Sequence, residues 1–342
     1  MASQTPALLV ANPTAQSGKN AARIAQARSL LAAAGVDHTL LPTLPAGRTV
    51  AAVTEALKSA SWRCVIAMGG DGTFAEVARG LYASGRGEEI PLGMLPTGTA
   101  NDQGRSFGLS AEESALARNV LVVTAGYETR LDAGRLRALD AHGALVHETL
   151  FFDSAGWGIS PRALAVRNED RKMIEEIPLV RDLWRDQLVY GGALLRTFLE
   201  GYVEDDGFAA DLDLDGASYA WPRLTDLILK GTRVYGGMWV LDPTSAHDDG
   251  LFEVVPMTGR RDWISKAMVR LDGSGQVEEA LRAVGVTHSP ERRGARMAFR
   301  FTTAPGALPL RAQVDGEEFP ATPQAEVEVL PRVIRLIMPR AP

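Results

Sequence analysis

The fold of this chain is decided by the stretch Val65-Ile66-Ala67-Met68-Gly69-Gly70-Asp71-Gly72-Thr73-Phe74-Ala75-Glu76. A short apolar run, typical of a buried strand, leads into three glycines within four residues, and a helical pattern follows at once. At such a turn the glycines let a ligand approach the backbone, and the N–H groups at the helix start favour an anion such as phosphate. Asp71 suits a site where a divalent cation accompanies the phosphate, because hard cations bind carboxylate oxygens. The alternative is an ordinary strand–turn–helix connection in which Asp71 caps the helix.

A second apolar run that ends in a polar turn lies at 91–102. The run 91–96 is typical of a short strand, and Thr97-Gly98-Thr99-Ala100-Asn101-Asp102 follows it. Threonine and glycine supply small donor groups, while Asn101 and Asp102 place polar side chains at an expected helix start. This turn is therefore the second half of the candidate site.

Apolar runs at 7–11 and 36–41 complete an alternation of strands with helical stretches, which we expect at about 20–34 and 49–60. The alternation continues to about residue 124 and predicts a doubly wound α/β unit, whose ligands bind at the carboxyl ends of the strands. Asn12 and Thr43 follow the first two strands, so all four turns fall on that one edge. Gly18-Lys19 is not part of a P-loop, because that motif needs glycine at position 13 and Ser or Thr at position 20.

Beyond residue 130 the pattern changes to short β-like segments at 148–153, 209–214, 224–230 and 236–241, separated by Gly, Asp and Pro. This predicts a second, mostly-β domain. We expect an α/β domain at 1–130 and a mostly-β domain at 131–342, whose last strand, at 327–338, either stays there or packs back on the first domain. Within the second domain, 161–202 has apolar residues at helical spacing with basic residues among them. Such a stretch either packs against a sheet or lies on a membrane surface.

Composition excludes several classes of protein. The chain has 342 residues and a formal net charge of −6, which does not favour binding to nucleic acid. A single cysteine, Cys64, cannot form a disulfide within the chain or a cysteine-type zinc site. No window of about 18 uncharged apolar residues is present, so a membrane-spanning helix is not expected. Without a basic, apolar leader at its start, the chain is expected to be cytoplasmic, with any membrane contact peripheral at the inner face.

The motifs together carry a family resemblance. Gly-Gly-Asp-Gly-Thr at 69–73, Pro-Thr-Gly-Thr-Ala-Asn-Asp at 96–102 and Asn12-Pro13 after the first strand resemble the diacylglycerol kinase catalytic family, which includes sphingosine, ceramide and bacterial lipid kinases. NAD kinases share the first motif only. The resemblance implies an N-terminal nucleotide-binding α/β domain, a C-terminal β-sandwich and ATP in the cleft between them. It is weak across 155–225, where the acceptor pocket is expected, and Asp153 and Trp157 are unexpected residues for the border of that pocket.

The resemblance also implies roles for individual residues. Asp71 and Asp102 would help to hold a Mg²⁺–phosphate assembly, and Asp132 would belong to a network linking the domains, although a turn cap is an equally good interpretation of Asp132. The full set of expected nucleotide-binding residues is Asn12, Thr43, Gly69, Gly70, Asp71, Gly72, Thr73, Glu76, Gly98, Thr99, Asn101 and Asp102.

The segment Ala246-His247-Asp248-Asp249-Gly250-Leu251 has two adjacent carboxylates before a glycine. By itself this pattern favours a solvated turn over a cation site. The resemblance implies a structural Mg²⁺ held by the Asp249 side chain and by the carbonyls of Ala246 and Leu251. His247 is expected to be exposed and without a role.

The segment Asp315-Gly316-Glu317 ends an apolar run and is, by itself, typical of a hairpin turn. The resemblance implies that it brings the general base to the nucleotide, which makes Glu317 and Asp315 the catalytic candidates. In an extended segment the two carboxylates would face the same side. Glu317 is then the expected proton acceptor, with Asp315 close behind.

These observations predict a lipid kinase that uses ATP and Mg²⁺ and meets a lipid acceptor such as diacylglycerol at the membrane surface. Three alternatives remain: an NAD kinase, a kinase of a non-lipid alcohol, and a non-catalytic lipid-binding or regulatory protein. The last is disfavoured because every carboxylate that the chemistry needs is present. The identity of the lipid and a homodimeric state are left open.

Overall fold

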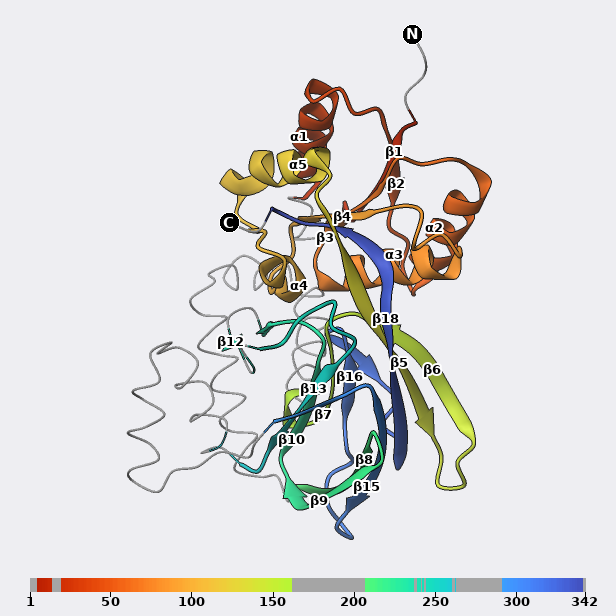
Figure 1. Ribbon diagram of the computed structural model, residues 1–342, viewed down its shortest axis with the longest axis vertical. Coiled ribbons are helices and arrows are strands. Elements are labelled where there is room, and N and C mark those ends of the chain that lie inside the picture. Colours follow the sequence, from red (N-terminus) through yellow and green to blue (C-terminus); the bar gives the residue numbers. More distant parts are fainter. Residues whose placement is uncertain are drawn as a thin grey trace, which may run out of the picture.

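The computed structural model describes residues 5–13, 20–161, 207–236, 239–240, 242, 244–259, 262 and 291–340 (Figure 1). The predicted helical stretch at 161–202 therefore lies outside the described residues beyond residue 161. Among the helices of the described ranges, none combines the length and the apolar character that crossing a bilayer requires.

Four parallel strands form the N-terminal part of the large sheet, in the order β2-β1-β3-β4. Their bounds are β1 Ala7–Ala11, β2 His38–Pro42, β3 Val65–Gly69 and β4 Leu92–Pro96. The connecting helices are α1 Asn20–Ala33, α2 Arg48–Ser59, α3 Asp71–Ala83, α4 Asp102–Ser106, the 3₁₀ turn η2 Glu113–Ala115 and α5 Leu116–Ala125. The alternation predicted from the sequence is confirmed, with boundaries within about two residues.

Successive side chains of each buried strand point to opposite faces of this sheet, so both faces are apolar, and helices cover both of them. Leu8 and Val10 of β1 pack in one core cluster with α2 and α3. Leu9, the residue between them, packs in another cluster with α1 and α5. The unit is therefore a doubly wound α/β domain, as predicted.

The C-terminal part is rich in strands. Two long strands, β5 Glu128–Leu139 and β18 Gln324–Ile337, pair antiparallel and connect the two parts of the molecule (Figure 1). Near its end β18 also pairs parallel with β4, at Leu336 and Leu92. The large sheet continues through β6 Leu145–Phe151, β8 Phe208–Leu214, β9 Ala217–Leu224 and β15 Arg296–Thr303.

A second sheet, in the order β14-β13-β10-β7-β16-β17, packs against this extension. Its strands are β7 Ser154–Gly158, β10 Asp226–Lys230, β13 Phe252–Met257, β14 Arg292–Gly294, β16 Ala312–Val314 and β17 Glu317–Phe319. Trp157 lies between the sheets, with its ring centroid 5.4 Å from that of Phe299 and 5.0 Å from that of Phe301. The predicted β-sandwich is thus present, and Trp157 belongs to its core.

Two of the predicted β segments differ in detail. The segment 224–230 is divided, since β9 ends at Leu224 and β10 begins at Asp226. The segment 236–241 contributes only β12, Trp239–Val240, which pairs with β11, Val234–Tyr235. The boundary predicted at residue 130 stays a prediction, because β5 continues through it without a break.

Candidate functional site

The carboxyl ends of the four parallel strands lie level with one another. Ala11 pairs with Pro42 and with Met68, and Gly69 pairs with Pro96. The turns that begin at residues 12, 43, 70 and 97 therefore meet at one edge of the sheet, as the sequence predicted.

Two of these turns are in direct contact. Thr97 donates its backbone N–H to the carbonyl of Gly69 at 2.7 Å. Gly70 and Gly98 pack backbone to backbone, so that a Cβ on Gly70 would lie 3.2 Å from the Gly98 Cα, and one on Gly98 would overlap the Gly70 Cα. Close approach of the two backbones therefore requires glycine at Gly98 and favours it at Gly70.

Asn101 shapes the second turn. Its φ of 54° is in the left-handed region that asparagine tolerates better than most residues. Its Oδ1 accepts the N–H of Gly98 at 2.8 Å, and its Nδ2 donates to the carbonyl of Gly98 at 2.7 Å. Asn101 was predicted to bind nucleotide, but its amide is used within the turn. Thr99 is exposed at the tip of the same turn.

The two aspartates of these motifs face different partners. Asp71 Oδ1 accepts the backbone N–H of Gln103 at 3.1 Å, and Asp102 Oδ2 accepts that of Gly236 at 2.7 Å. Burial, followed by the charge of Asp153, raises the pKa of Asp71 to about 6, against the opposing effects of nearby N–H groups and Lys230. A bound cation would favour the ionised carboxylate, so Asp71 fits a site for a metal that arrives with a phosphate.

The other predicted nucleotide-binding residues lie along the same edge. The backbone N–H of Asn12 donates to Met68, and that of Thr43 donates to Ala11. Thr73 is buried in the first turn of α3, beneath Gly69.

The Asp-Gly-Glu segment forms a tight hairpin between β16 and β17. Asp315 and Gly316 have φ values of 48° and 79°, which is the pattern of a two-residue type I′ turn. The prediction that Asp315 and Glu317 face the same side of an extended segment is wrong, because the turn separates them.

Asp315 points into the protein. Its Oδ1 accepts backbone N–H groups of Asp153 at 2.9 Å and Ser154 at 3.2 Å, and its Oδ2 accepts that of Phe152 at 3.1 Å. Arg79 Nη2 lies 3.4 Å from Oδ2. Burial raises the pKa of Asp315 to about 6, although Arg79 acts in the opposite direction. This carboxylate therefore anchors the hairpin to the segment before β7.

Glu317 points out of the protein. Its side chain is 57% exposed, and Oε1 lies 3.1 Å from the position that a Cβ would take on Gly72. The carboxylate is therefore placed against the first turn of α3. Glu76 lies one turn further along the helix; burial raises its pKa, and the charge of Glu317 adds to the shift.

A buried ion pair adjoins the site and was not predicted. Lys230 Nζ lies 2.6 Å from Asp153 Oδ1, and the two side chains are 1% and 4% exposed. Thr232 also donates to Asp153, and Ser106 of α4 donates to Thr232 at 3.2 Å. The cluster joins α4 to the second sheet. A lone lysine after the apolar run 227–229 was the signal in the sequence that could have revealed it.

The Asp-Asp-Gly loop is held by side chains of this chain. Asp132 accepts the N–H of Gly250 at 2.6 Å and that of Arg332 at 2.7 Å, so it links β5, the loop and β18. His247 is partly buried with its ring edge against Phe107 at 5.8 Å, so the expectation that it is exposed is wrong.

Asp249, the side chain expected to bind Mg²⁺, forms an ion pair with Arg293 and accepts the N–H of Leu251 at 3.0 Å. Within the described ranges no group of three or more His, Cys, Asp or Glu side chains is arranged to hold a metal. With the guanidinium in this position the donors do not fit a cation, and ligation by Asp249, Ala246 and Leu251 stays a prediction.

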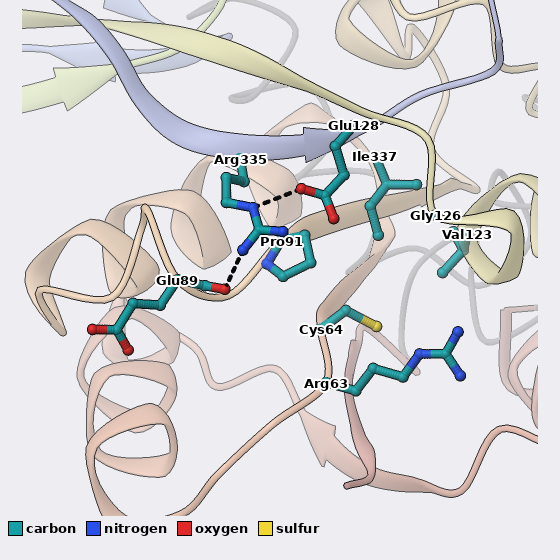
Figure 2. Close-up of a pocket in the computed structure, with 9 residues that line it drawn as sticks. All are labelled: Arg63, Cys64, Glu89, Pro91, Val123, Gly126, Glu128, Arg335 and Ile337. Atoms are coloured by element: carbon teal, nitrogen blue, oxygen red, sulfur yellow. Dashed lines mark hydrogen bonds and ion pairs between the residues drawn. The ribbon is translucent and has the colours of Figure 1, made fainter. Parts of the chain in front are cut away.

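A cavity of about 220 Å³ lies at the opposite edge of the sheet, where β3 and β4 begin (Figure 2). Arg335 crosses it, with Nε 2.6 Å from Glu128 and Nη1 donating to the carbonyl of Glu89 at 2.7 Å. Cys64 also lines the cavity, and burial raises the pKa of its thiol to about 11. Because it lies at the edge of the sheet away from the turns, and Arg335 and Glu128 in it are paired with each other, this cavity is not the candidate site.

Comparisons with known proteins agree with this geometry. A family model described as the diacylglycerol kinase catalytic domain matches residues 6–136. A Pseudomonas aeruginosa protein named "Probable lipid kinase YegS-like" is 31% identical over 270 residues, which cover 75% of this chain and 78% of that protein.

Two solved structures share the fold. A diacylglycerol kinase from Bacillus anthracis str. Sterne has a TM-score of 0.64 at 18% identity, covering 98% of this chain and 97% of that one. Yeast NADH kinase has a TM-score of 0.51 at 9% identity, covering 98% of this chain and 84% of that one. The sequence relatives, together with the glycine turns and the Asp-Gly-Glu hairpin at one edge of the sheet, show that the chain belongs to the diacylglycerol kinase catalytic-domain family.

Proposed function

We propose that this protein transfers the γ-phosphate of ATP to a hydroxyl group of a lipid such as diacylglycerol, with Mg²⁺. The observation that carries the proposal is the position of Glu317, whose carboxylate lies against the first turn of α3, next to the glycine turn. A proton acceptor and a phosphate-binding helix start are thereby brought together from distant parts of the chain.

One set of residues is proposed to bind the phosphates and the metal, and another to accept the proton. The N–H groups at the start of α3 suit the phosphates, and the contact between Gly70 and Gly98 leaves no room for a side chain between the two turns. Asp71 and Asp102 would hold the metal that arrives with ATP, and such a metal supplies positive charge to the transferring phosphoryl group.

Glu317 would accept the proton of the attacking hydroxyl. We assign Asp315 a different role, since its carboxylate already accepts three backbone N–H groups and lies beside Arg79. Its work is to fix the hairpin on which Glu317 stands. The proposed proton acceptor is therefore Glu317, the exposed one of the two carboxylates.

The lipid acceptor is supported by the family model and by the name of the Pseudomonas relative. A lipid substrate would bring the protein to a membrane surface, so we include peripheral membrane contact in the proposal.

The test is transfer of labelled γ-phosphate from ATP, with Mg²⁺, to lipids in mixed micelles. The panel contains diacylglycerol, phosphatidylglycerol, ceramide and sphingosine, with NAD as a soluble acceptor. Glu317→Gln is the site variant. Arg137→Gln is its matched control, because within the described residues Arg137 makes surface ion pairs with Glu326 and Glu148 and none with the site. We expect one labelled lipid, lost in Glu317→Gln and kept in Arg137→Gln. Labelling of NAD alone, or of no acceptor, would refute the proposal.

A further inference from the structure

Arg79 is a charged residue of α3 that neither the sequence motifs nor the proposed chemistry has used. It lies seven residues after Gly72 on the same helix, about 10 Å along the helix axis. Its side chain is only 17% exposed, although it carries a positive charge. A guanidinium that is this buried must be held by partners.

The partners of Arg79 come from the Asp-Gly-Glu hairpin and from the strand beside it. Nε donates to the carbonyl of Leu150 in β6 at 2.7 Å. Nη2 lies 3.4 Å from Asp315 Oδ2, and Nη1 lies 3.9 Å from Glu317 Oε2. The planar guanidinium has donors on three separate nitrogens and so reaches three groups in this way, whereas the donors of an ammonium group all leave from one nitrogen.

The contacts place one cation among several carboxylates. Asp315 and Glu317 face the guanidinium from the hairpin, and Glu76 faces it from α3 itself. Without Arg79 these carboxylates would repel one another across the same small region. Glu317 is the most exposed partner, with no other ion pair in the described ranges, so it would be the first to turn toward solvent.

We propose that Arg79 is a positioning residue that holds Glu317 over the first turn of α3, so that one helix fixes both the phosphate turn and the proton acceptor. The inference rests on the proposed function, because it assigns to Glu317 the role of acceptor. Arg79 does not itself touch the reacting atoms in this scheme.

The kinetic test is a double-mutant cycle with Arg79→Gln, Glu317→Gln and the double variant, measured as kcat and as KM for ATP. We expect Arg79→Gln to lower kcat by about 10- to 100-fold, as a misplaced catalytic group does, with KM for ATP changed less than about twofold. Glu317→Gln should lower kcat by about 10²- to 10⁴-fold. The double variant should be no slower than Glu317→Gln, because Arg79 acts only through Glu317.

Two kinetic results would overturn the inference. Multiplying effects in the double variant would mean that Arg79 acts separately from Glu317. A large rise in KM for ATP would mean that Arg79 binds the nucleotide. If Arg79→Gln does not fold, Arg79→Lys replaces it in the cycle, because lysine keeps a charge beside Asp315 but lacks the planar fork that spans Asp315, Glu317 and Leu150.

A readout that needs no activity separates this inference from the proposed function. Amide hydrogen exchange of the peptide 312–319 should become faster in Arg79→Gln, and exchange in α3 should not change. Arg137→Gln should leave both unchanged. If exchange of 312–319 is faster in Arg79→Gln but the wild-type protein transfers no phosphate, the proposed function is refuted while Arg79 still anchors the hairpin. Unchanged exchange at 312–319 would refute the role of Arg79.

Discussion

Asp315→Ala should lower the stability of the protein, whereas Glu317→Ala should lower its kcat and leave its stability nearly unchanged, although the two residues are only two positions apart. Asp315→Ala removes the acceptor for three buried backbone N–H groups, those of residues 152, 153 and 154, and leaves Arg79 without its nearest carboxylate. Each buried donor left unsatisfied costs about 1–3 kcal/mol. Part of that loss is offset, because burial of the Asp315 carboxylate, which raises its pKa to about 6, itself destabilises the folded protein and is removed with the side chain. We therefore expect a net loss of about 3 kcal/mol in the free energy of unfolding.

Such a loss corresponds to a Tm lower by about 6–12 °C for a domain of 150–250 residues. Glu317→Ala removes a side chain that is 57% exposed, so the free energy of unfolding should change by less than about 0.5 kcal/mol. Its kcat should nevertheless fall by about 10²- to 10⁴-fold. Thermal unfolding followed by circular dichroism, with phosphate transfer measured on the same samples, checks both variants.

The pH dependence of the Asp315→Ala effect has a definite sign. The folded-state pKa of Asp315, about 6, is above the ordinary value of 3.8, so the stability that this group contributes is full below pH 3.8 and is lost as pH rises through 6. The cost of Asp315→Ala should therefore be larger at pH 4 than at pH 8, by up to about 3 kcal/mol. Equal loss of stability in both variants, or an active Glu317→Ala, would refute the reasoning.

Three further perturbations test other parts of the structure. Gly98→Ala would place a methyl group on the opposing glycine backbone and should cost about 1–3 kcal/mol in urea unfolding, whereas Gly259→Ala, with nothing within 4 Å, should be nearly neutral. Lys230→Met should lower the free energy of unfolding by about 3–5 kcal/mol, because it leaves the buried Asp153 without its cation. Adding Asp153→Asn should recover most of that loss. A double variant as unstable as Lys230→Met would show that the ion pair is not the cause. Cys64, with a pKa of about 11, should react with iodoacetamide at pH 8 only after the protein unfolds, and rapid labelling of the folded protein would contradict its burial.

Local patterns were sufficient to predict the part of the site that is made of turns. The strand run 65–69, the glycines after it and the helical pattern after those lie within a dozen residues, and short-range rules link them. The same is true of the Asp-Gly turn at 315–316, whose hairpin signal was present in the sequence. The prediction that Asp315 and Glu317 lie in one extended segment was wrong because Asp315-Gly316 form the turn itself.

The side chains that organise the site could not be predicted in the same way. Arg79 and Asp315 are 236 residues apart, and Lys230 and Asp153 are 77 residues apart. Nothing in the residues near Arg79 shows which carboxylate it will meet. The pairing of β10 with β7 places Lys230 beside Asp153. The pairing of β18 with β5 and β4 brings residues 324–337 to the N-terminal sheet.

That pairing has a consequence for the order in which the protein forms during synthesis. Ile334 and Leu336, near the end of β18, are fully buried in the core cluster that holds β1, β3, β4 and α3. The ribosome makes these residues after the whole N-terminal sheet, so the first 130 residues leave the exit tunnel with an apolar strip of their sheet uncovered. Until β18 arrives, β4 has an open edge that invites pairing with another chain. A chain that ends before residue 334 would therefore keep that edge exposed and would be prone to aggregate.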